Sequence, residues 1–273
     1  MKIVSFNTNS VRLRLHQLRA LTDKITPDII GLQETKAQDH EFPIEALEEM
    51  GYKAIFMGQK THYGVALLYR KDIELVDFQK GWKTDGEDAQ KRMIIGDFIL
   101  ENGEKVRVVN GYFPQGESRD HPIKFPAKEK FYQDLMAYLN TECDPSQKIA
   151  VIGDFNISPT DLDIGIGEPN RKRWLRDGKT SFLPEEREWW QTLLDWGLTD
   201  TFRTIHPDTN EIFSWFDYRS KGFDREPRRG LRIDTILATE SLNKKAVASE
   251  VGYDVRGMEK PSDHAPVWTE FKF

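Results

Sequence analysis

The fold of this chain is decided by the run Lys148-Ile149-Ala150-Val151-Ile152-Gly153-Asp154-Phe155-Asn156. Its apolar part has the length and composition of a strand that is buried on both faces. Polar side chains follow where such a strand gives way to a loop. Taken alone, Gly-Asp-x-Asn is an ordinary turn in which the Asp and Asn side chains bond to nearby backbone groups. The rest of the chain, however, repeats the arrangement.

Three other apolar runs meet polar side chains in the same way. Two of them end at Asn7 and Glu34, and a third follows Asp263 and His264 directly. Buried strands that converge at one sheet edge would gather these groups into an oxygen-rich pocket with one imidazole. Such a pocket suits metal-assisted cleavage of a phosphodiester. Because no Cys or His cluster accompanies them, these oxygen ligands favour Mg²⁺, with Mn²⁺ able to substitute.

Asp234 lies inside an otherwise apolar strand, where an unpaired carboxylate would be costly. His264 is the natural partner, since an Asp bonded to one ring nitrogen fixes the tautomer and leaves the other nitrogen facing substrate. The alternative is a structural ion pair between Asp234 and Arg232. We expect the His264 pair to form.

The polar strand ends are spread from Asn7 to His264, and no linker-like segment divides the 273 residues. We therefore expect one domain, residues 1–273, with strands and helices in a mixed α/β sandwich. Helices are expected from a cap at Asn9-Ser10 and at 44–50, 126–143 and 185–196. Strands are expected at 2–7, 28–33, 53–57, 63–69, 93–100, 105–113, 148–154, 212–218, 231–238, 246–253 and 266–273.

The net charge of −6 hides two basic clusters, at residues 170–176 and 217–232. A charged run is usually just a solvated surface. Two arginine-rich loops beside a metal pocket instead indicate contact with a phosphate backbone. The balance of 31% charged and 38% apolar residues is that of a globular protein.

No segment is long and apolar enough for a membrane span, and Asn7 and Asn9 interrupt any signal-peptide core. The single cysteine, Cys143, excludes an internal disulfide and suits a reducing compartment. These features predict a cytoplasmic protein with no membrane partner.

Several motifs together resemble the endonuclease/exonuclease/phosphatase (DNase I-like) superfamily. These are residues 111–116, 153–159, 231–234 and 262–267. Residues 120–128 and 171–176 are similar to its exonuclease III branch. The resemblance implies a four-layer α/β sandwich with two central mixed sheets flanked by helices. It also implies a metal-dependent DNA-repair phosphodiesterase, a 3′-to-5′ exonuclease on duplex DNA that cuts on the 5′ side of abasic sites and removes blocking 3′ groups.

The resemblance also assigns roles to particular side chains. Glu34 resembles the principal metal ligand, Asp154 the acid/base residue, and Asn156 the group that stabilises the transition state. The catalytic set is Tyr112, Asp154, Asn156, Asp234 and His264. The metal set is Asn7, Glu34, Asp154, Asn156, Asp263 and His264. The DNA-binding set is Gln115, Lys124, Arg171, Arg173, Trp215, Phe216, Arg228, Arg229 and Leu231, of which Trp215, Phe216 and Leu231 would enclose an abasic sugar.

The chain departs from the family pattern in Asn7-Thr8-Asn9-Ser10 and in loop 223–230, which is slightly longer and more basic. That loop is expected near the minor groove. The expected partner is double-stranded DNA with abasic sites or blocked 3′ ends, bound by a monomer. Alternatives are another phosphoesterase of the superfamily, acting on inositol phosphates, sphingomyelin or RNA, and a catalytically inactive DNA-binding relative.

Overall fold

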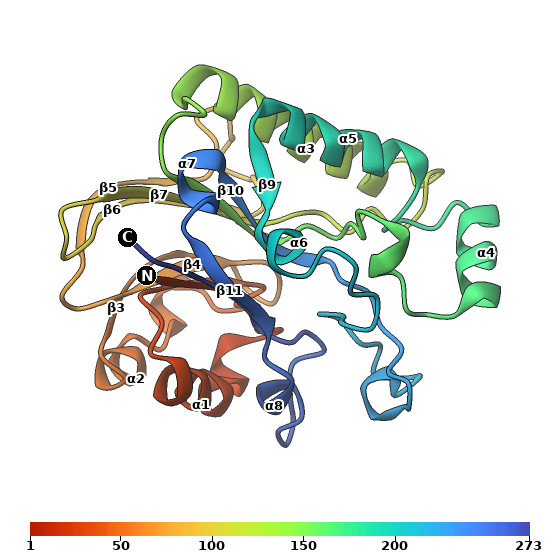
Figure 1. The fold of residues 1–273 in the computed structure, drawn as a ribbon, viewed down its shortest axis with the longest axis horizontal. Helices are drawn as coiled ribbons and strands as arrows, with labels where there is room; N and C mark the ends of the chain where they lie inside the picture. The colour runs from red at the N-terminus through yellow and green to blue at the C-terminus, as the bar shows by residue number, and fades with distance from the viewer.

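Two six-stranded sheets pack face to face in a computed structural model that describes residues 1–273 (Figure 1). The first sheet has the order β11 (Ala246–Val251), β12 (Val267–Phe271), β1 (Lys2–Asn7), β2 (Ile29–Gln33), β4 (Val65–Arg70) and β3 (Tyr52–Met57). The second has the order β5 (Glu74–Lys80), β6 (Met93–Ile99), β7 (Lys105–Tyr112), β8 (Ile149–Asp154), β10 (Asp234–Thr239) and β9 (Leu198–Asp200).

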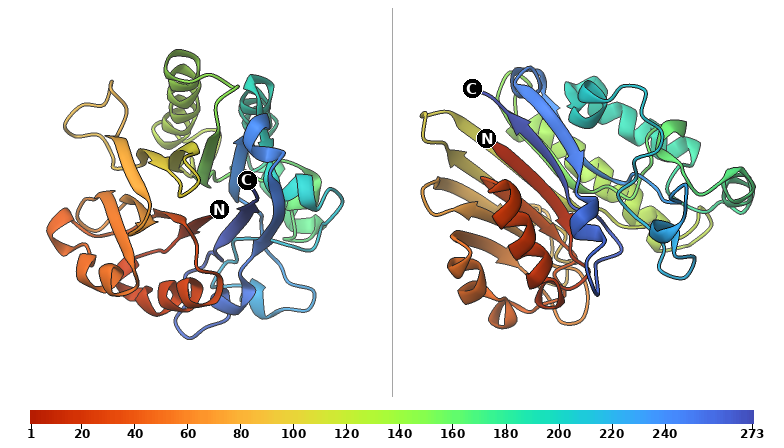
Figure 2. Two further views of the ribbon diagram at one scale, coloured as in Figure 1. Left: turned by 60° about the vertical axis from the view of Figure 1, so that its left-hand side comes forward. Right: turned by 60° about the horizontal axis from the view of Figure 1, so that its bottom comes forward.

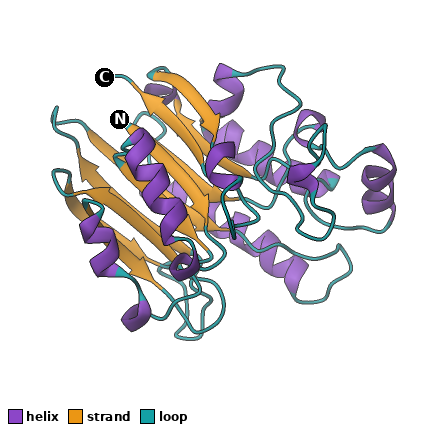
Figure 3. Ribbon diagram, turned by 90° about the horizontal axis from the view of Figure 1, so that it is seen from below, coloured by secondary structure: helices purple, strands orange, loops and turns teal.

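Helices cover both outer faces, which gives the expected four layers. Below the first sheet lie α1 (Leu15–Ile25), α2 (Ile44–Glu49) and α8 (Tyr253–Arg256) (Figure 3). Above the second sheet lie α3 (Lys124–Glu142) and α5 (Pro184–Trp196). The remaining helices are α4 (Glu168–Arg176), α6 (Thr201–Ile205) and α7 (Glu240–Asn243). None of the helices combines the length and apolarity needed to cross a bilayer.

The central strands read as continuous apolar runs because both of their faces are buried. In β8, Ala150 and Ile152 belong to the core between the sheets, while Ile149 and Val151 pack toward α3 and α5. Strand β1 alternates in the same way, so that Val4 and Phe6 lie in the core beneath the first sheet. These strands therefore have hydrophobic layers on both sides.

Strand directions place the polar ends together. Strands β1 and β2 run parallel and end at one edge of the first sheet, and β7 and β8 run parallel and end at one edge of the second sheet. Strands β10 and β12 run antiparallel to β8 and β1, which brings their first residues to the same edge. In register, Asp154 lies opposite both Tyr112 and Asp234. Figure 2 shows both chain termini at the end of the molecule away from the loops around α4.

Some expected elements were wrong. Residues 212–218 form no strand, because Trp215 makes only isolated bridges to Leu231 and His264. Asn9 and Ser10 do not cap a helix; both have positive φ angles, and α1 begins only at Leu15.

The basic cluster at 171–176 lies in helix α4 and not in a loop. Strands β5 and β9 and the short helix α6 were not anticipated. Strand β5 is a mostly exposed edge strand, so it lacks the buried pattern that marks the others.

Candidate active site

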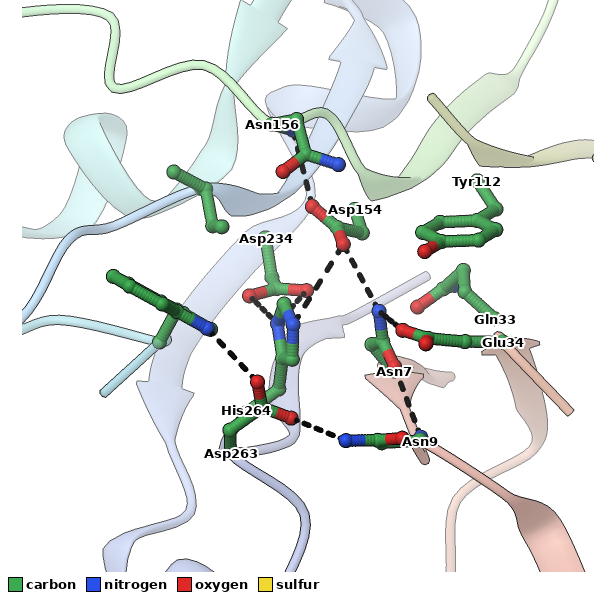
Figure 4. Close-up of polar contacts among 12 residues, drawn as sticks. Asn7, Asn9, Gln33, Glu34, Tyr112, Asp154, Asn156, Asp234, Asp263 and His264 are labelled. Atoms are coloured by element: carbon green, nitrogen blue, oxygen red, sulfur yellow. Dashed lines mark hydrogen bonds and ion pairs between the residues drawn. The ribbon is translucent and has the colours of Figure 1, made fainter. Parts of the chain in front are cut away.

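The polar strand ends open into a cavity of about 610 Å³ between the two sheets and the loops beside α4. Figure 4 shows these side chains facing one another from both sheets. The cavity wall includes Glu34, Tyr112, Asp154, Asn156, Asp263 and His264. The structure thus brings the predicted catalytic and metal-binding residues to one place, although Asn7 and Asp234 lie behind the cavity wall.

His264 lies between two buried carboxylates. Its Nδ1 is 2.8 Å from Asp234 Oδ2, and its Nε2 is 3.7 Å from Asp154 Oδ2. Burial opposes a charge on the ring, but Asp234 and Asp154 outweigh it and raise the pKa of His264 to about 10. The imidazole is therefore held protonated, as an electrostatic group and hydrogen-bond donor. A protonated ring has no lone pair for a metal, so this arrangement does not favour His264 as a metal ligand.

The expected pairing of Asp234 with His264 is confirmed, and the alternative pairing with Arg232 is wrong. Arg232 instead donates from Nε to Asp163 and from Nη2 to Asp200, each at 2.6 Å. Both partners come from loops and a short strand far along the chain, and sequence spacing does not reveal them. The backbone N–H of Asp234 is held by Ser214 Oγ at 3.0 Å, which fixes the start of β10.

Asp154 has the chemistry of an acid/base group near neutral pH. Burial raises its pKa to about 7, Asp234 adds to the rise, and His264 opposes it. The Asn7 side-chain amide donates to Asp154 Oδ2 at 2.9 Å and to Glu34 Oε2 at 3.1 Å. One amide group therefore spans the two carboxylates that end β8 and follow β2. Its oxygen accepts the backbone N–H of Asn9 at 3.0 Å.

Two residues that sequence reasoning missed hold the carboxylates in place. Asn9 Nδ2 donates to Asp263 Oδ1 at 3.0 Å, and Lys36 Nζ bonds to Asn9 Oδ1 at 2.7 Å and lies 3.0 Å from Glu34 Oε1. Trp215 Nε1 donates to the other Asp263 oxygen at 3.0 Å. Although burial opposes ionisation, the charge of His264 and these two donors lower the pKa of Asp263. In the sequence, a charged lysine only two residues after Glu34 was the feature that could have indicated the role of Lys36.

Tyr112 presents a neutral phenol to the cavity. Burial raises its pKa well above the usual value, so the hydroxyl remains a donor. Arg92, also missed from the sequence, stacks on its ring with Cζ 4.7 Å from the centroid and donates to its backbone oxygen at 3.0 Å. The same guanidinium lies 4.4 Å from the Tyr63 ring centroid.

Asn156 sits directly beside Asp154. Its backbone N–H donates to Asp154 Oδ1 at 3.0 Å, and its side-chain amide donates to the Phe113 oxygen at 2.9 Å. Its φ of 51° lies in the left-handed region, which few non-glycine residues adopt. Tertiary contacts must therefore hold this residue in its observed conformation.

The expected DNA-binding residues divide into two groups. Gln115, Arg173, Trp215, Arg229 and Leu231 line the cavity. The others lie away from it: Lys124 is exposed and pairs with Glu117, and Arg171 pairs with Asp161 and Glu168. The cavity is also lined by Asn170, Trp174 and Lys179, and by Arg219 and Arg225 of the second basic cluster.

The expectation that Phe216 encloses an abasic sugar is wrong. Its side chain is fully buried and packs against Phe223 and Tyr253, 5.1 and 5.8 Å between ring centroids, so it cannot enclose a sugar. Arg228 stacks on the same two rings and lies outside the cavity. The arginine and the aromatic side chains stabilise the loop from behind. Neighbouring residues thus differ: Trp215 lies on the cavity wall, and Phe216 lies in the core of the loop.

The donor set fits a hard divalent cation. Glu34, Asp154 and Asp263 bring carboxylate oxygens to the wall of one cavity. Closely spaced buried carboxylates repel one another unless a cation or a proton compensates. No cysteine lies at the site. Oxygen ligands without sulfur are typical of Mg²⁺, Ca²⁺ and Mn²⁺ sites.

Comparisons with known proteins agree with this geometry. A model of the Endonuclease/Exonuclease/phosphatase family matches residues 4–264. Exodeoxyribonuclease III of Haemophilus influenzae is 58% identical over 272 residues, covering 100% of both chains. Among solved structures, the 3′ phosphatase NExo from Neisseria bound to a product DNA hairpin has 37% identity and a TM-score of 0.88. An AP endonuclease from Archaeoglobus fulgidus has 32% identity and the same TM-score; each covers 100% of both chains.

Proposed function

Because the chain belongs to the endonuclease/exonuclease/phosphatase family, we propose a mechanism in which it acts as a DNA-repair nuclease. The protein is a phosphodiester hydrolase of the exodeoxyribonuclease III type, with exonuclease, abasic-site endonuclease and 3′-phosphatase activities. The observation that carries the mechanism is His264, held protonated between Asp234 and Asp154 on the wall of the cavity.

The substrate is proposed to be duplex DNA with an abasic site or a blocked 3′ end. Although the chain is acidic overall, five cationic side chains line the cavity: Arg173, Lys179, Arg219, Arg225 and Arg229. They come from α4 and the loops that follow α4 and β9, so they flank the catalytic groups along one side. Cationic side chains that contact the phosphate backbone supply a large, salt-dependent share of a protein's affinity for DNA.

Trp215 and Leu231 form the apolar part of the same cavity. A deoxyribose without a base fits beside them, whereas a paired base must first be unstacked at a cost of a few kcal/mol. This difference is the proposed origin of the preference for abasic sites. Phe216 takes no part in it, because its ring is buried in the loop.

In the proposed reaction, water attacks phosphorus as the bond to the 3′ oxygen breaks. Asp154, with its pKa near 7, takes the proton of the water and returns it to the leaving 3′ oxygen. His264 and the neutral phenol of Tyr112 donate to the non-bridging oxygens, where negative charge grows. Asn156, bonded to Asp154 through its backbone, is proposed to donate to the same oxygens.

A bound divalent cation would supply further positive charge at the phosphate and lower the barrier to attack. We propose Mg²⁺, with Mn²⁺ able to substitute, held by Glu34, Asp154 and Asp263, with Asn7 beside them. The carboxylate oxygens and the absence of sulfur support this choice. We also propose that residues 1–273 work as a single domain and as a cytoplasmic monomer. Strand ends from both sheets of one chain supply every group that the reaction needs.

A cleavage assay with and without chelator tests the proposal. The substrates are a labelled DNA duplex with a recessed 3′ end, an RNA duplex, and an inositol phosphate. Cleavage of the DNA duplex that requires added Mg²⁺ is expected. Hydrolysis of the inositol phosphate alone would indicate another phosphoesterase of the family, and DNA binding without cleavage would indicate an inactive relative.

A further inference from the structure

A buried ion pair lies behind the cavity and takes no part in the mechanism above. Lys128 of α3 and Glu186 of α5 bond to each other, and both side chains are fully buried. Two charges inside a protein lose their hydration, and their mutual attraction often fails to compensate fully. An apolar pair would join the two helices at least as well. The other partners of the two charged groups indicate what the pair does.

Those partners are the backbones of three loops. The Lys128 ammonium donates to the Asn156 oxygen at 2.8 Å and to the Gln115 oxygen at 3.3 Å. Glu186 Oε2 accepts the backbone N–H of Ser181 at 2.8 Å. Gln115, Asn156 and Ser181 all line the cavity. One ion pair therefore connects three segments of the cavity wall from behind.

Asn156 depends most on this support. Asparagine adopts a left-handed φ such as the 51° of Asn156 more readily than other residues with a side chain, but its buried carbonyl oxygen still needs a hydrogen-bond partner, which Lys128 supplies. Tyr132, one turn further along α3 than Lys128, donates its hydroxyl to the Phe155 oxygen at 2.8 Å. Two residues of α3 thus hold consecutive carbonyls. Tyr132 fixes the peptide plane that precedes Asn156, and Lys128 fixes the plane that follows it.

The ammonium group is fully used in these contacts. Its three N–H donors match three acceptors, namely Glu186, the Asn156 oxygen and the Gln115 oxygen. The carboxylate of Glu186 compensates the buried charge of Lys128 with one oxygen, and its second oxygen accepts the N–H groups of Ser181 and Leu183. The Leu183 contact is the capping box of α5, but a pair that served only to join α3 to α5 would not need the other three backbone contacts, to Asn156, Gln115 and Ser181.

We propose that Lys128 is a positioning residue for catalysis, held by Glu186 so that it fixes Asn156 and the Gln115 loop against the scissile phosphate. The inference rests on the proposed role of Asn156 in the reaction. It assigns to the ion pair an effect on the chemical step that is separate from its effect on folding. A displacement of about 1 Å in a positioned group typically costs about 100-fold in rate.

The test compares Lys128→Met with the double variant Lys128→Met/Glu186→Gln. The single variant leaves a buried carboxylate unpaired, so it should also lose stability. The double variant removes that charge and keeps an oxygen for the Ser181 N–H. Lys130→Met is the matched control, because Lys130 is exposed on α3 and pairs only with Asp134 on the same helix. Single-turnover rates and DNA dissociation constants are measured well below the unfolding midpoint of each variant.

The double variant should be more stable than Lys128→Met and still lose about 100-fold in single-turnover rate, with a dissociation constant within about threefold of the wild type. Lys130→Met should match the wild type. Recovery of the wild-type rate together with stability would overturn the inference, because the pair would then act only through folding. A loss confined to DNA affinity would overturn it as well.

A second measurement needs neither substrate nor metal. The amide resonance of Ile157 in a nitrogen-15 spectrum should shift in the double variant, since its peptide carries the Asn156 oxygen that Lys128 no longer holds, and should not shift in Lys130→Met. An unchanged resonance would contradict the positioning role. If the wild type showed no Mg²⁺-dependent cleavage, the proposed function would fail, whereas this spectrum would still test the contact between Lys128 and Asn156.

Discussion

Replacing Asp234 by asparagine isolates the charge that keeps His264 protonated. Asp234 Oδ2 lies 2.8 Å from His264 Nδ1, and both side chains are buried. Asparagine has the same size, so the backbone bond from Asp234 to Ser214 Oγ should remain. The variant therefore changes the charge beside the imidazole with little change in shape.

The loss of rate that we expect follows from how burial and the neighbouring carboxylates set the pKa of His264. Burial lowers the pKa of His264, and the charges of Asp234 and Asp154 together raise it to about 10. Without Asp234, burial is opposed only by the charges of Asp154 and Asp263, and the pKa of His264 should fall toward the ordinary value of about 6.5. At pH 8 the ring would become mostly neutral. Loss of one charged donor to the transition state typically costs about 100- to 1000-fold in rate.

Single-turnover cleavage at pH 8 measures this loss, and an NMR titration of the imidazole measures the pKa. Asp208→Asn is the matched control, since Asp208 is an exposed carboxylate outside the cavity. We expect a rate about 100-fold or more below that of the control. A ring that stays protonated at pH 8 in Asp234→Asn, or a rate close to that of the control, would refute the reasoning about His264.

Five further substitutions test other parts of the protein. Glu34→Gln should raise the Mg²⁺ concentration needed for half-maximal rate, with partial recovery at high Mg²⁺; an unchanged midpoint would remove Glu34 from the metal site. Arg229→Gln should reduce the salt dependence of DNA affinity by about one phosphate contact, whereas Arg228→Gln should leave the slope unchanged and lower the unfolding midpoint. Trp215→Ala should reduce abasic-site incision much more than removal of a 3′ phosphate, and equal losses would contradict the sugar pocket. Burial opposes ionisation of Asp163, but the guanidinium groups of Arg232 and Arg203 outweigh it, so the pKa of Asp163 is lowered and its charge stabilises the fold above about pH 4. In urea unfolding, Asp163→Asn should therefore cost less stability at pH 3 than at pH 7. An equal loss of stability at the two pH values would exclude this linkage.

The sequence predicted which polar residues converge in the cavity, because they lie at the ends of buried strands. A strand buried on both faces gives a continuous apolar run, and the first polar residue after it must have a reason to be there. Asp154 and Glu34 were found in this way. The pairing of Asp234 with His264 followed from the cost of burying a lone carboxylate.

The loops around the site were predicted less well, because their contacts depend on tertiary structure. Residues 212–218 alternate like a strand, but Trp215 bonds only to isolated partners and Phe216 packs into the loop core. The partners of Arg232 are Asp163 and Asp200, at distances along the chain that no local pattern encodes. Lys128 ends the motif at residues 120–128, but nothing in the sequence indicated that it is buried, since a lysine in an amphipathic helix is ordinarily exposed.

The most direct test of the mechanism is a duplex with a single abasic site, labelled at both ends of the strand that carries it. We expect an Mg²⁺-dependent cut on the 5′ side of the site, leaving a 3′ hydroxyl on one fragment and a 5′ phosphate on the abasic fragment. This outcome corresponds to breakage of the bond to the 3′ oxygen, with water as the nucleophile. Cleavage that persists in chelator, or a cut on the 3′ side of the abasic sugar, would contradict the account.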